Sequence, residues 1–322
     1  MNRRSFVSFS AAALSGLQVS RDLFGSQLAV PKQAMKLRIG HPLADPFCMK
    51  WGQFYYLTGT YSTGRPAKTG QAFDLLRSTD LIEWKSLGPV LRIPDYEGSR
   101  QANYWAPEIL PHRGKFHLYF TSDSFGDAYR RFVRVAIADN IEGPYESDGR
   151  PLTGEPSIDG HPFYSSDREG YLFYTGNEGN PHMGQVLVDR LVSPNQLAGK
   201  PRKVFPSETV EWEEGAFLLR KNGEFYLFSS QGNWRNATYH ILVAKSKTVA
   251  GPYQRIFDAD DRKVLETNEH QIGPGHNSLF DGPGGLTYVC YHAWDQAHTG
   301  RYAWIAPLFW DNDFPLVGET RC

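Results

Sequence analysis

A plan that recurs five times along the chain constrains the fold most strongly. Each copy has an acidic or polar residue near a turn, a second turn with Gly or charged residues, and an aromatic β-prone segment. The copies begin about 50 to 65 residues apart, which is the size of one supersecondary unit of a repeat architecture. The segments are ADPFCMKWGQFYYLTGT, WAPEILPHRGKFHLYFTSDS, SIDGHPFYSSDREGYLFYTG, EEGAFLLRKNGEFYLFSS and GHNSLFDGPGGLTYVCYHAW, marked by Asp45, Glu108, Asp159, Glu214 and His276.

The local pattern between these markers is that of short strands. The chain contains 31 Gly and 21 Pro without a collagen-like period, and strands bounded by Gly, Pro, Asn and Asp are frequent, whereas helical periodicity is hard to find. The sequence therefore predicts an all-β, five-bladed β-propeller in one domain over residues 36–322. Its blades are expected at about residues 40–100, 101–153, 154–207, 208–270 and 271–320.

The first residues, MNRRSFVSFSAAALSGLQVS, are typical of an export signal of the twin-arginine type. Residues 1–35 are accordingly predicted to be a signal and linker that direct the protein to the periplasm or outside a bacterial cell. The alternative is a basic N-terminal tail. The apolar run is too short to span a bilayer, so the mature protein is expected to have no membrane span.

Charge and cysteine usage exclude several classes of protein. With 34 Lys and Arg against 35 Asp and Glu, the chain lacks the basic surplus of a nucleic-acid-binding protein. Cys48, Cys290 and Cys322 are widely separated and odd in number, so they form neither a disulfide framework nor a zinc site. We expect Cys48 and Cys290 to be core residues.

Three acidic residues are expected to meet at one end of the propeller axis. The innermost strand of each blade runs along that axis, so Asp45, Asp159 and Glu214 become neighbours. Two carboxyl groups that flank a glycosidic bond are the usual equipment for sugar hydrolysis, and a third acid raises the pKa of the proton donor by like-charge repulsion. Only one of Glu213 and Glu214 can face the axis with its strand mates; the following Gly favours Glu214.

The chain resembles family 43 of the glycoside hydrolases, a family of inverting five-bladed propellers that cut arabinofuranosyl and xylosyl linkages. The resemblance lies in the order of the five segments and in the motifs YWAPEI, IGPGHNSLF and GRYAWIAPLFW. The resemblance implies that Asp45 is the general base, Asp159 the residue that tunes the pKa of the donor, and Glu214 the general acid. One departure is Ala216, where the family usually has proline after Glu-Gly.

The same resemblance suggests supporting residues. Trp105 is expected either to stack on a sugar or to pack between blades, and Glu108 either to form a wall of the site or to pair within the propeller. Arg301 is expected to face the substrate or the acids. His276 matches the axial histidine that holds a cation mostly through waters in some family members, so either a structural role or a calcium is implied, and no cofactor is expected to be required.

The leading functional prediction is an inverting hydrolase of α-L-arabinofuranosyl linkages in plant cell-wall arabinan or arabinoxylan. The alternatives on the same scaffold are a β-D-xylosidase and an endo-arabinanase. An alternative of another class is a non-catalytic sugar-binding propeller, which would be free to lose the three acids that this chain retains.

Overall fold

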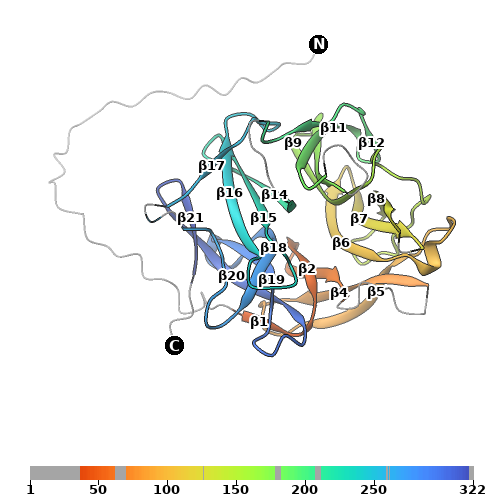
Figure 1. The fold of residues 1–322 in the computed structure, drawn as a ribbon. Helices are drawn as coiled ribbons and strands as arrows, with labels where there is room; N and C mark the ends of the chain where they lie inside the picture. The colour runs from red at the N-terminus through yellow and green to blue at the C-terminus, as the bar shows by residue number, and fades with distance from the viewer. Residues whose placement is uncertain are drawn as a thin grey trace, which may run out of the picture. The chain divides into compact units, whose positions relative to one another are not determined.

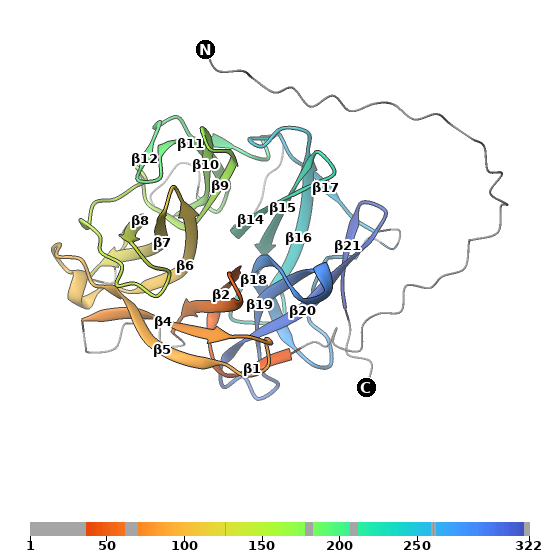
Figure 2. The ribbon, with the colours of Figure 1, turned by 180° about the vertical axis from the view of Figure 1, so that it is seen from behind.

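Five β-sheets surround one axis, and their innermost strands ring its centre (Figure 1). The structure is a computed structural model that describes residues 37–318, except 62–69, 126, 178–182, 207–211, 259 and 261. Seen from behind, the same five sheets follow one another in the opposite sense (Figure 2). This arrangement confirms the predicted all-β, five-bladed propeller.

The blades are named I to V in chain order. Blade I contains β2 (Ala44–Trp51), β3 (Phe54–Thr60), β4 (Gln71–Ser78) and β5 (Lys85–Arg92), and blade II contains β6 (Tyr104–His112), β7 (Lys115–Ser124) and β8 (Asp127–Ala138). Blade III contains β9 (Ser157–Ser166), β10 (Glu169–Gly176), β11 (Val186–Ser193), β12 (Gln196–Leu197) and β13 (Arg202–Lys203). Blade IV contains β14 (Glu213–Lys221), β15 (Glu224–Gln231), β16 (His240–Ser246) and β17 (Gln254–Ile256). Blade V contains β18 (Ile272–Asp281), β19 (Thr287–Trp294), β20 (Arg301–Asp311), β21 (Phe314–Val317) and β1 (Leu37–Pro42).

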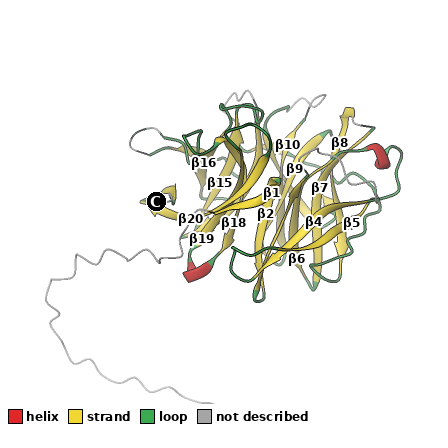
Figure 3. Cartoon of the chain, turned by 90° about the horizontal axis from the view of Figure 1, so that it is seen from below, coloured by secondary structure: helices red, strands yellow, loops and turns green. Residues whose placement is uncertain are grey.

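The helical content of the described chain is limited to two short 3-10 turns, drawn in red in Figure 3. They are η1 (Ser99–Gln101) and η2 (Pro283–Gly285). No helix in the described part of the chain has the length and apolar character needed to cross a membrane.

The first strand closes the ring by joining the last blade. Strand β1 pairs antiparallel with β20, with Leu37 opposite Ile305 and Arg38 opposite Trp304. The expected boundary of the first blade at about residue 40 is therefore corrected, because residues up to Pro42 belong to the sheet of blade V. Local pattern could not reveal this pairing, since the two strands lie at opposite ends of the chain.

Both faces of the middle strands are buried because each blade lies between two others. On β7, Leu118 and Phe120 face one core cluster, whereas Tyr119 between them faces a second cluster. Successive side chains of a strand point to opposite faces, so an unbroken aromatic and aliphatic run fills two cores at once. Cys48 and Cys290 are buried free thiols in a third cluster, as predicted; Cys322 lies outside the described residues.

Each innermost strand carries a bulge at the same place. The strand register shifts between Ala44 and Phe47 in β2, and at the corresponding position in the other four. The first bulged residue has a left-handed backbone in every case, with φ of 46° at Asp45, 47° at Ala106, 58° at Asp159, 61° at Gly215 and 47° at His276. The bulge bends the strand and aims the adjoining side chains toward the axis.

Neighbouring blades are connected at these bulges by side-chain hydrogen bonds. A side chain at the end of a second strand accepts the N–H of the bulged residue in the next blade. The acceptors are Thr60 for Ala106 at 2.8 Å, Thr121 for Asp159 at 2.9 Å, Ser230 for His276 at 2.8 Å, and Nδ1 of His292 for Asp45 at 3.0 Å. Blade IV differs, because the hydroxyl of Thr175 donates to the carbonyl of Glu213 instead, at 3.0 Å. These contacts fix the positions of the functional side chains relative to one another.

Candidate active site

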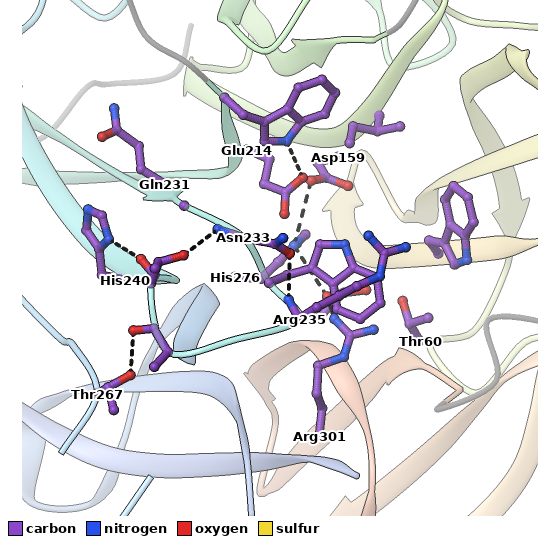
Figure 4. A pocket seen from close by; sticks show the side chains of 18 of the residues that line it. Thr60, Asp159, Glu214, Gln231, Asn233, Arg235, His240, Thr267, His276 and Arg301 are labelled. Atoms are coloured by element: carbon purple, nitrogen blue, oxygen red, sulfur yellow. Dashed lines mark hydrogen bonds and ion pairs between the residues drawn. The ribbon is translucent and has the colours of Figure 1, made fainter. Parts of the chain in front are cut away.

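A cavity of about 1220 Å³ lies at the bulged ends of the innermost strands (Figure 4). Pockets for one small ligand are roughly 300 to 1,000 Å³, so this cavity has room for more than one sugar unit. All five blades contribute to it, and blade IV contributes the largest part through the loop between β15 and β16. The described lining residues are Asp45, Thr60, Asn103, Trp105, Arg131, Ile158, Asp159, Asn177, Trp212, Glu214, Gln231, Gly232, Asn233, Trp234, Arg235, Ala237, Thr238, His240, Lys263, Glu266, Thr267, His276 and Arg301.

Asp45 is held as an anion mainly by Arg301 and His276. Its Oδ1 lies 3.3 Å from the guanidinium of Arg301, 3.3 Å from Nδ1 of His292 and 3.6 Å from Nδ1 of His276. Burial alone would raise the pKa of Asp45, but Arg301 and then His276 outweigh burial and hold that pKa well below its usual range. His292 is neutral, because burial lowers its pKa to about 4, and its Nδ1 accepts the backbone N–H of Asp45. Asp45 is therefore an ionised carboxylate at neutral pH.

Asp159 has the opposite electrostatic character. Its Oδ2 accepts the N–H of Gly215 at 3.2 Å and lies 3.7 Å from Nδ1 of His276. Burial, opposed by His276 and reinforced by Glu214 and Asp45, raises the pKa of Asp159 to about 7. This carboxyl group is protonated in mildly acidic solution, while Asp45 remains charged.

Glu214 enters the cavity between two donors. Its Oε2 accepts the indole N–H of Trp212 at 2.7 Å, and its Oε1 accepts the hydroxyl of Tyr239 at 2.7 Å. Burial and the adjacent Glu214 raise the pKa of Tyr239 well above its usual value, so this hydroxyl keeps its proton. Two donors fix the orientation of the carboxyl group.

The neighbouring Glu213 points away from the cavity. It is fully buried and pairs with Arg255 at 2.6 Å. Its other oxygen accepts the hydroxyl of Ser229. Of the two glutamates, it is therefore Glu214 that lines the cavity, with Glu213 closing an ion pair inside blade IV.

His276 lies between the acids rather than in a metal cage. Burial would lower its pKa, but Asp159, Asp45 and then Glu214 raise it, so the imidazole is favoured as a cation. The described residues contain no group of three or more His, Cys, Asp or Glu side chains arranged to hold a metal. Calcium prefers six to eight oxygen ligands, so these side chains offer no direct calcium site. A calcium near His276 that is held through waters stays a prediction.

The predicted substrate-binding residues divide into two groups. Arg301 and Trp105 line the cavity, and each is paired: Arg301 lies 4.3 Å from the ring centre of Trp234, and Arg131 lies 4.7 Å from that of Trp105. Glu108 does not belong to the described lining. Its carboxylate accepts the Nδ1–H of His161 at 2.7 Å. The proton of His161 lies on Nδ1 because its Nε2 accepts the backbone N–H of Leu218 at 3.1 Å. The structure thus supports pairing within the propeller for Glu108.

Sequence reasoning missed His292, Tyr239 and Trp212. His292 stands opposite Gly275 in the register, as Thr60 stands opposite Ala44, so it takes the place of a hydroxyl residue in blade V. The repeat held this signal, because YHAW aligns with the small polar ends of the other segments. Its ring stacks on that of Tyr239 with centres 5.7 Å apart, which connects the surroundings of Asp45 to those of Glu214.

An ionised carboxylate and a second carboxyl group of higher proton affinity, here Asp45 and Asp159, are a combination found at sites of acid-base hydrolysis. The model for the family "Glycosyl hydrolases family 43" matches residues 39–315. The chain belongs to this family. It is a glycosidase, and its substrate is a carbohydrate.

Family 43 relatives cover much of the chain. Beta-D-galactofuranosidase xynD of Aspergillus niger is 28% identical over 263 residues, which cover 77% of this chain and 73% of that relative. Extracellular exo-alpha-(1->5)-L-arabinofuranosidase ArbA of Cellvibrio japonicus is 26% identical and covers 86% of each chain. A putative beta-xylosidase of Xylanibacter ruminicola is 24% identical over 86% of this chain and half of its own. A crystal structure of a thermostable family-43 glycoside hydrolase has a TM-score of 0.73 at 24% identity, over 87% of this chain and 94% of that one, and supports the fold.

Proposed function

We propose that this family 43 enzyme hydrolyses α-L-arabinofuranosyl linkages of plant cell-wall arabinan or arabinoxylan with inversion of configuration. The observation that carries the proposal is the pairing of opposite protonation tendencies in one cavity. Asp45 is ionised beside Arg301, whereas the pKa of Asp159 is raised to about 7 and Glu214 is held by two donors.

In the proposed reaction, the Asp45 carboxylate takes a proton from a water molecule. The water oxygen forms a bond to the anomeric carbon as the bond from that carbon to the leaving oxygen breaks, and Glu214 gives its proton to the leaving oxygen. The reaction leaves Asp45 protonated and Glu214 ionised, and proton exchange with solvent restores both. Asp159, whose carboxyl group accepts the N–H of Gly215, holds the backbone next to the acid in position.

The arabinofuranosyl preference is supported by the names of similar proteins. Both the galactofuranosidase and the arabinofuranosidase act on sugars in the five-membered ring form. The β-D-xylosidase and endo-arabinanase alternatives use the same three acids. The sugar-binding alternative is disfavoured, because Asp45, Asp159 and Glu214 are all retained and all line one cavity, and because the chain belongs to a glycosidase family.

We further propose that residues 1–35, which lie outside the described residues, export the protein, and that no metal is required for hydrolysis. A calcium near His276 would then have a structural role. Dialysis against a chelator is expected to leave kcat unchanged, and a loss of kcat that added calcium restores would contradict this.

The test is release of 4-nitrophenol from the α-L-arabinofuranoside and the β-D-xylopyranoside, with wild type and Asp45→Ala compared. We expect release from the arabinofuranoside by wild type only. Faster release from the xylopyranoside would replace the proposal by the xylosidase alternative. No release from either, with cleavage of debranched arabinan, would favour the endo-arabinanase.

A further inference from the structure

The positive charges of the cavity are not all balanced. Arg301 pairs with Asp45 at 3.3 Å, and Lys263 pairs with Glu266 at 3.6 Å. Arg131 and Arg235 also line the cavity, yet no carboxylate of the described chain lies within ion-pair distance of either. The walls outside the three acids therefore carry two positive charges without counter-charges in the described part of the protein.

Arg131 is held in place by an aromatic ring rather than by an acid. It belongs to β8 of blade II, and its guanidinium lies 4.7 Å from the centre of the Trp105 ring. Its Nε is buried and has no hydrogen-bond partner among the described residues. Because solvent does not reach this Nε, a ligand in the cavity would contact the terminal N–H groups of Arg131 instead.

The geometry of this pair suits a carboxylate. A guanidinium that contacts an aromatic ring keeps terminal N–H donors, and two of these match the two oxygens of a carboxylate. Asn103, two residues before Trp105 in the chain, also lines the cavity. Its side-chain N–H donates to Asp123 at 2.7 Å, so its side-chain oxygen is left as an acceptor for a sugar hydroxyl.

We propose that the Arg131–Trp105 wall binds a sugar unit that carries a carboxylate, a hexuronic acid, on the same polysaccharide as the cleaved glycoside. The inference rests on the proposed function in one respect: the hexuronic acid is taken to be part of the polysaccharide that the enzyme cleaves. The size of the cavity, about 1220 Å³, allows such a unit to be bound next to the sugar at the three acids.

Arg235 adds positive charge from another wall. It is exposed and lies 4.4 Å from the ring centre of Trp234, the ring that Arg301 also contacts. Figure 4 shows Arg235 and Arg301 on the same side of the cavity. Solvent screens an exposed charge, so Arg235 contributes less to carboxylate binding than Arg131.

The test measures binding separately from hydrolysis. The probes are xylotriose substituted with glucuronic acid and the same compound with its carboxyl group reduced, titrated calorimetrically into the Asp45→Asn variant at low salt. We expect the acidic probe to bind roughly tenfold more tightly than the reduced probe, as for a charge-assisted bidentate contact. Arg131→Gln, added to this variant, should bring the ratio close to one.

Arg130→Gln is the matched control, because it removes the same charge from the adjacent residue of β8, whose partner is Glu97 at 3.9 Å and which does not line the cavity. It should keep the preference. The inference would be overturned if the Asp45→Asn variant bound both probes equally, or if Arg131→Gln left the ratio of the two affinities unchanged. An equal loss of the preference in Arg130→Gln would also overturn it.

Release of 4-nitrophenol by the wild-type protein separates this inference from the proposed function. Turnover without a preference for the acidic probe would overturn the inference alone. A preference for the acidic probe in a protein that cleaves no arabinofuranoside would overturn the proposed function and support the carboxylate site.

Discussion

Blades II and III have the same backbone bulge, but only the bulge of blade III carries an ionisable side chain. Ala106 and Asp159 both begin a bulge with a left-handed backbone, and both amides are accepted by a threonine of the preceding blade. In blade II the position carries a methyl group and no reactive chemistry, whereas in blade III it carries a buried carboxyl group with a raised pKa. The bulge is therefore part of the propeller architecture, and the acid is an addition to it.

The comparison extends to the other blades. Asp45 and His276 occupy the same position in blades I and V, and Asp and His tolerate left-handed backbone better than most residues. Blade IV has Gly215 there, where an added Cβ would lie 3.1 Å from the ring of His276. Its acid, Glu214, stands one residue earlier.

The largest expected effect is that of Asp159→Asn on turnover. Asn accepts a left-handed backbone, so the bulge should persist while the titratable carboxyl group beside the other acids is lost. We expect kcat to fall by about 1,000-fold, within the range for a positioned acid-base group. Steady-state kinetics on the aryl glycoside that the enzyme cleaves provide the measurement, and a loss below tenfold would refute the role of Asp159.

The same variant sharpens the comparison through stability. Folding raises the pKa of Asp159 from 3.8 to about 7. The contribution of this group to the free energy of unfolding therefore falls as the pH rises from about 4 to 7. Loss of the proton from His276, whose pKa is also raised, acts in the same direction. Relative to wild type, Asp159→Asn should therefore gain stability across this window, by at most about 4 kcal/mol. Urea unfolding at pH 4 and pH 8 measures the gain, and a gain that shrinks with pH would contradict it.

The adjacent glutamates of blade IV provide the next contrast. Glu214→Ala should slow cleavage of substrates with poor leaving groups by about 100-fold or more, and affect the 4-nitrophenyl glycoside much less. Glu213→Ala should instead destabilise the fold by about 3 to 5 kcal/mol, because it removes the buried carboxylate that pairs with the largely buried side chain of Arg255. Leaving-group dependence in the Glu213 variant and not in the Glu214 variant would reverse the assignment.

The smallest expected effect is that of Ala106→Gly. Relief of the left-handed backbone, worth about 1 to 2 kcal/mol, is offset by greater freedom of the unfolded chain and by the lost methyl group. We expect a change in the free energy of unfolding below about 1 kcal/mol and kcat within twofold of wild type. A large kinetic loss in this variant would show that blade II contributes chemistry at the bulge.

The repeat predicted the fold and grouped Asp45, Asp159 and Glu214, because acidic or polar residues recur near the blade starts at intervals of about 50 to 65 residues. It placed Glu108 among the markers although Ala106 is the structural equivalent, since a search for polar residues does not detect a bulge. Tyr239 and Trp212 lie in loops, and the directions of their side chains follow from packing between blades. Arg255 binds Glu213, which leaves Glu214 as the glutamate in the cavity, and this contact joins residues distant in sequence. The pairing of β1 with β20 has the same long-range cause.

The measurement that tests the central claim most directly is the configuration of the first product, followed by proton nuclear magnetic resonance during cleavage of the aryl arabinofuranoside. An ionised Asp45 that activates water predicts that the β-anomer of arabinose appears first and that added methanol yields no methyl glycoside with the starting configuration. If the α-anomer appears first, or such a methyl glycoside forms, the reaction passes through a covalent intermediate and the role assigned to Asp45 is wrong.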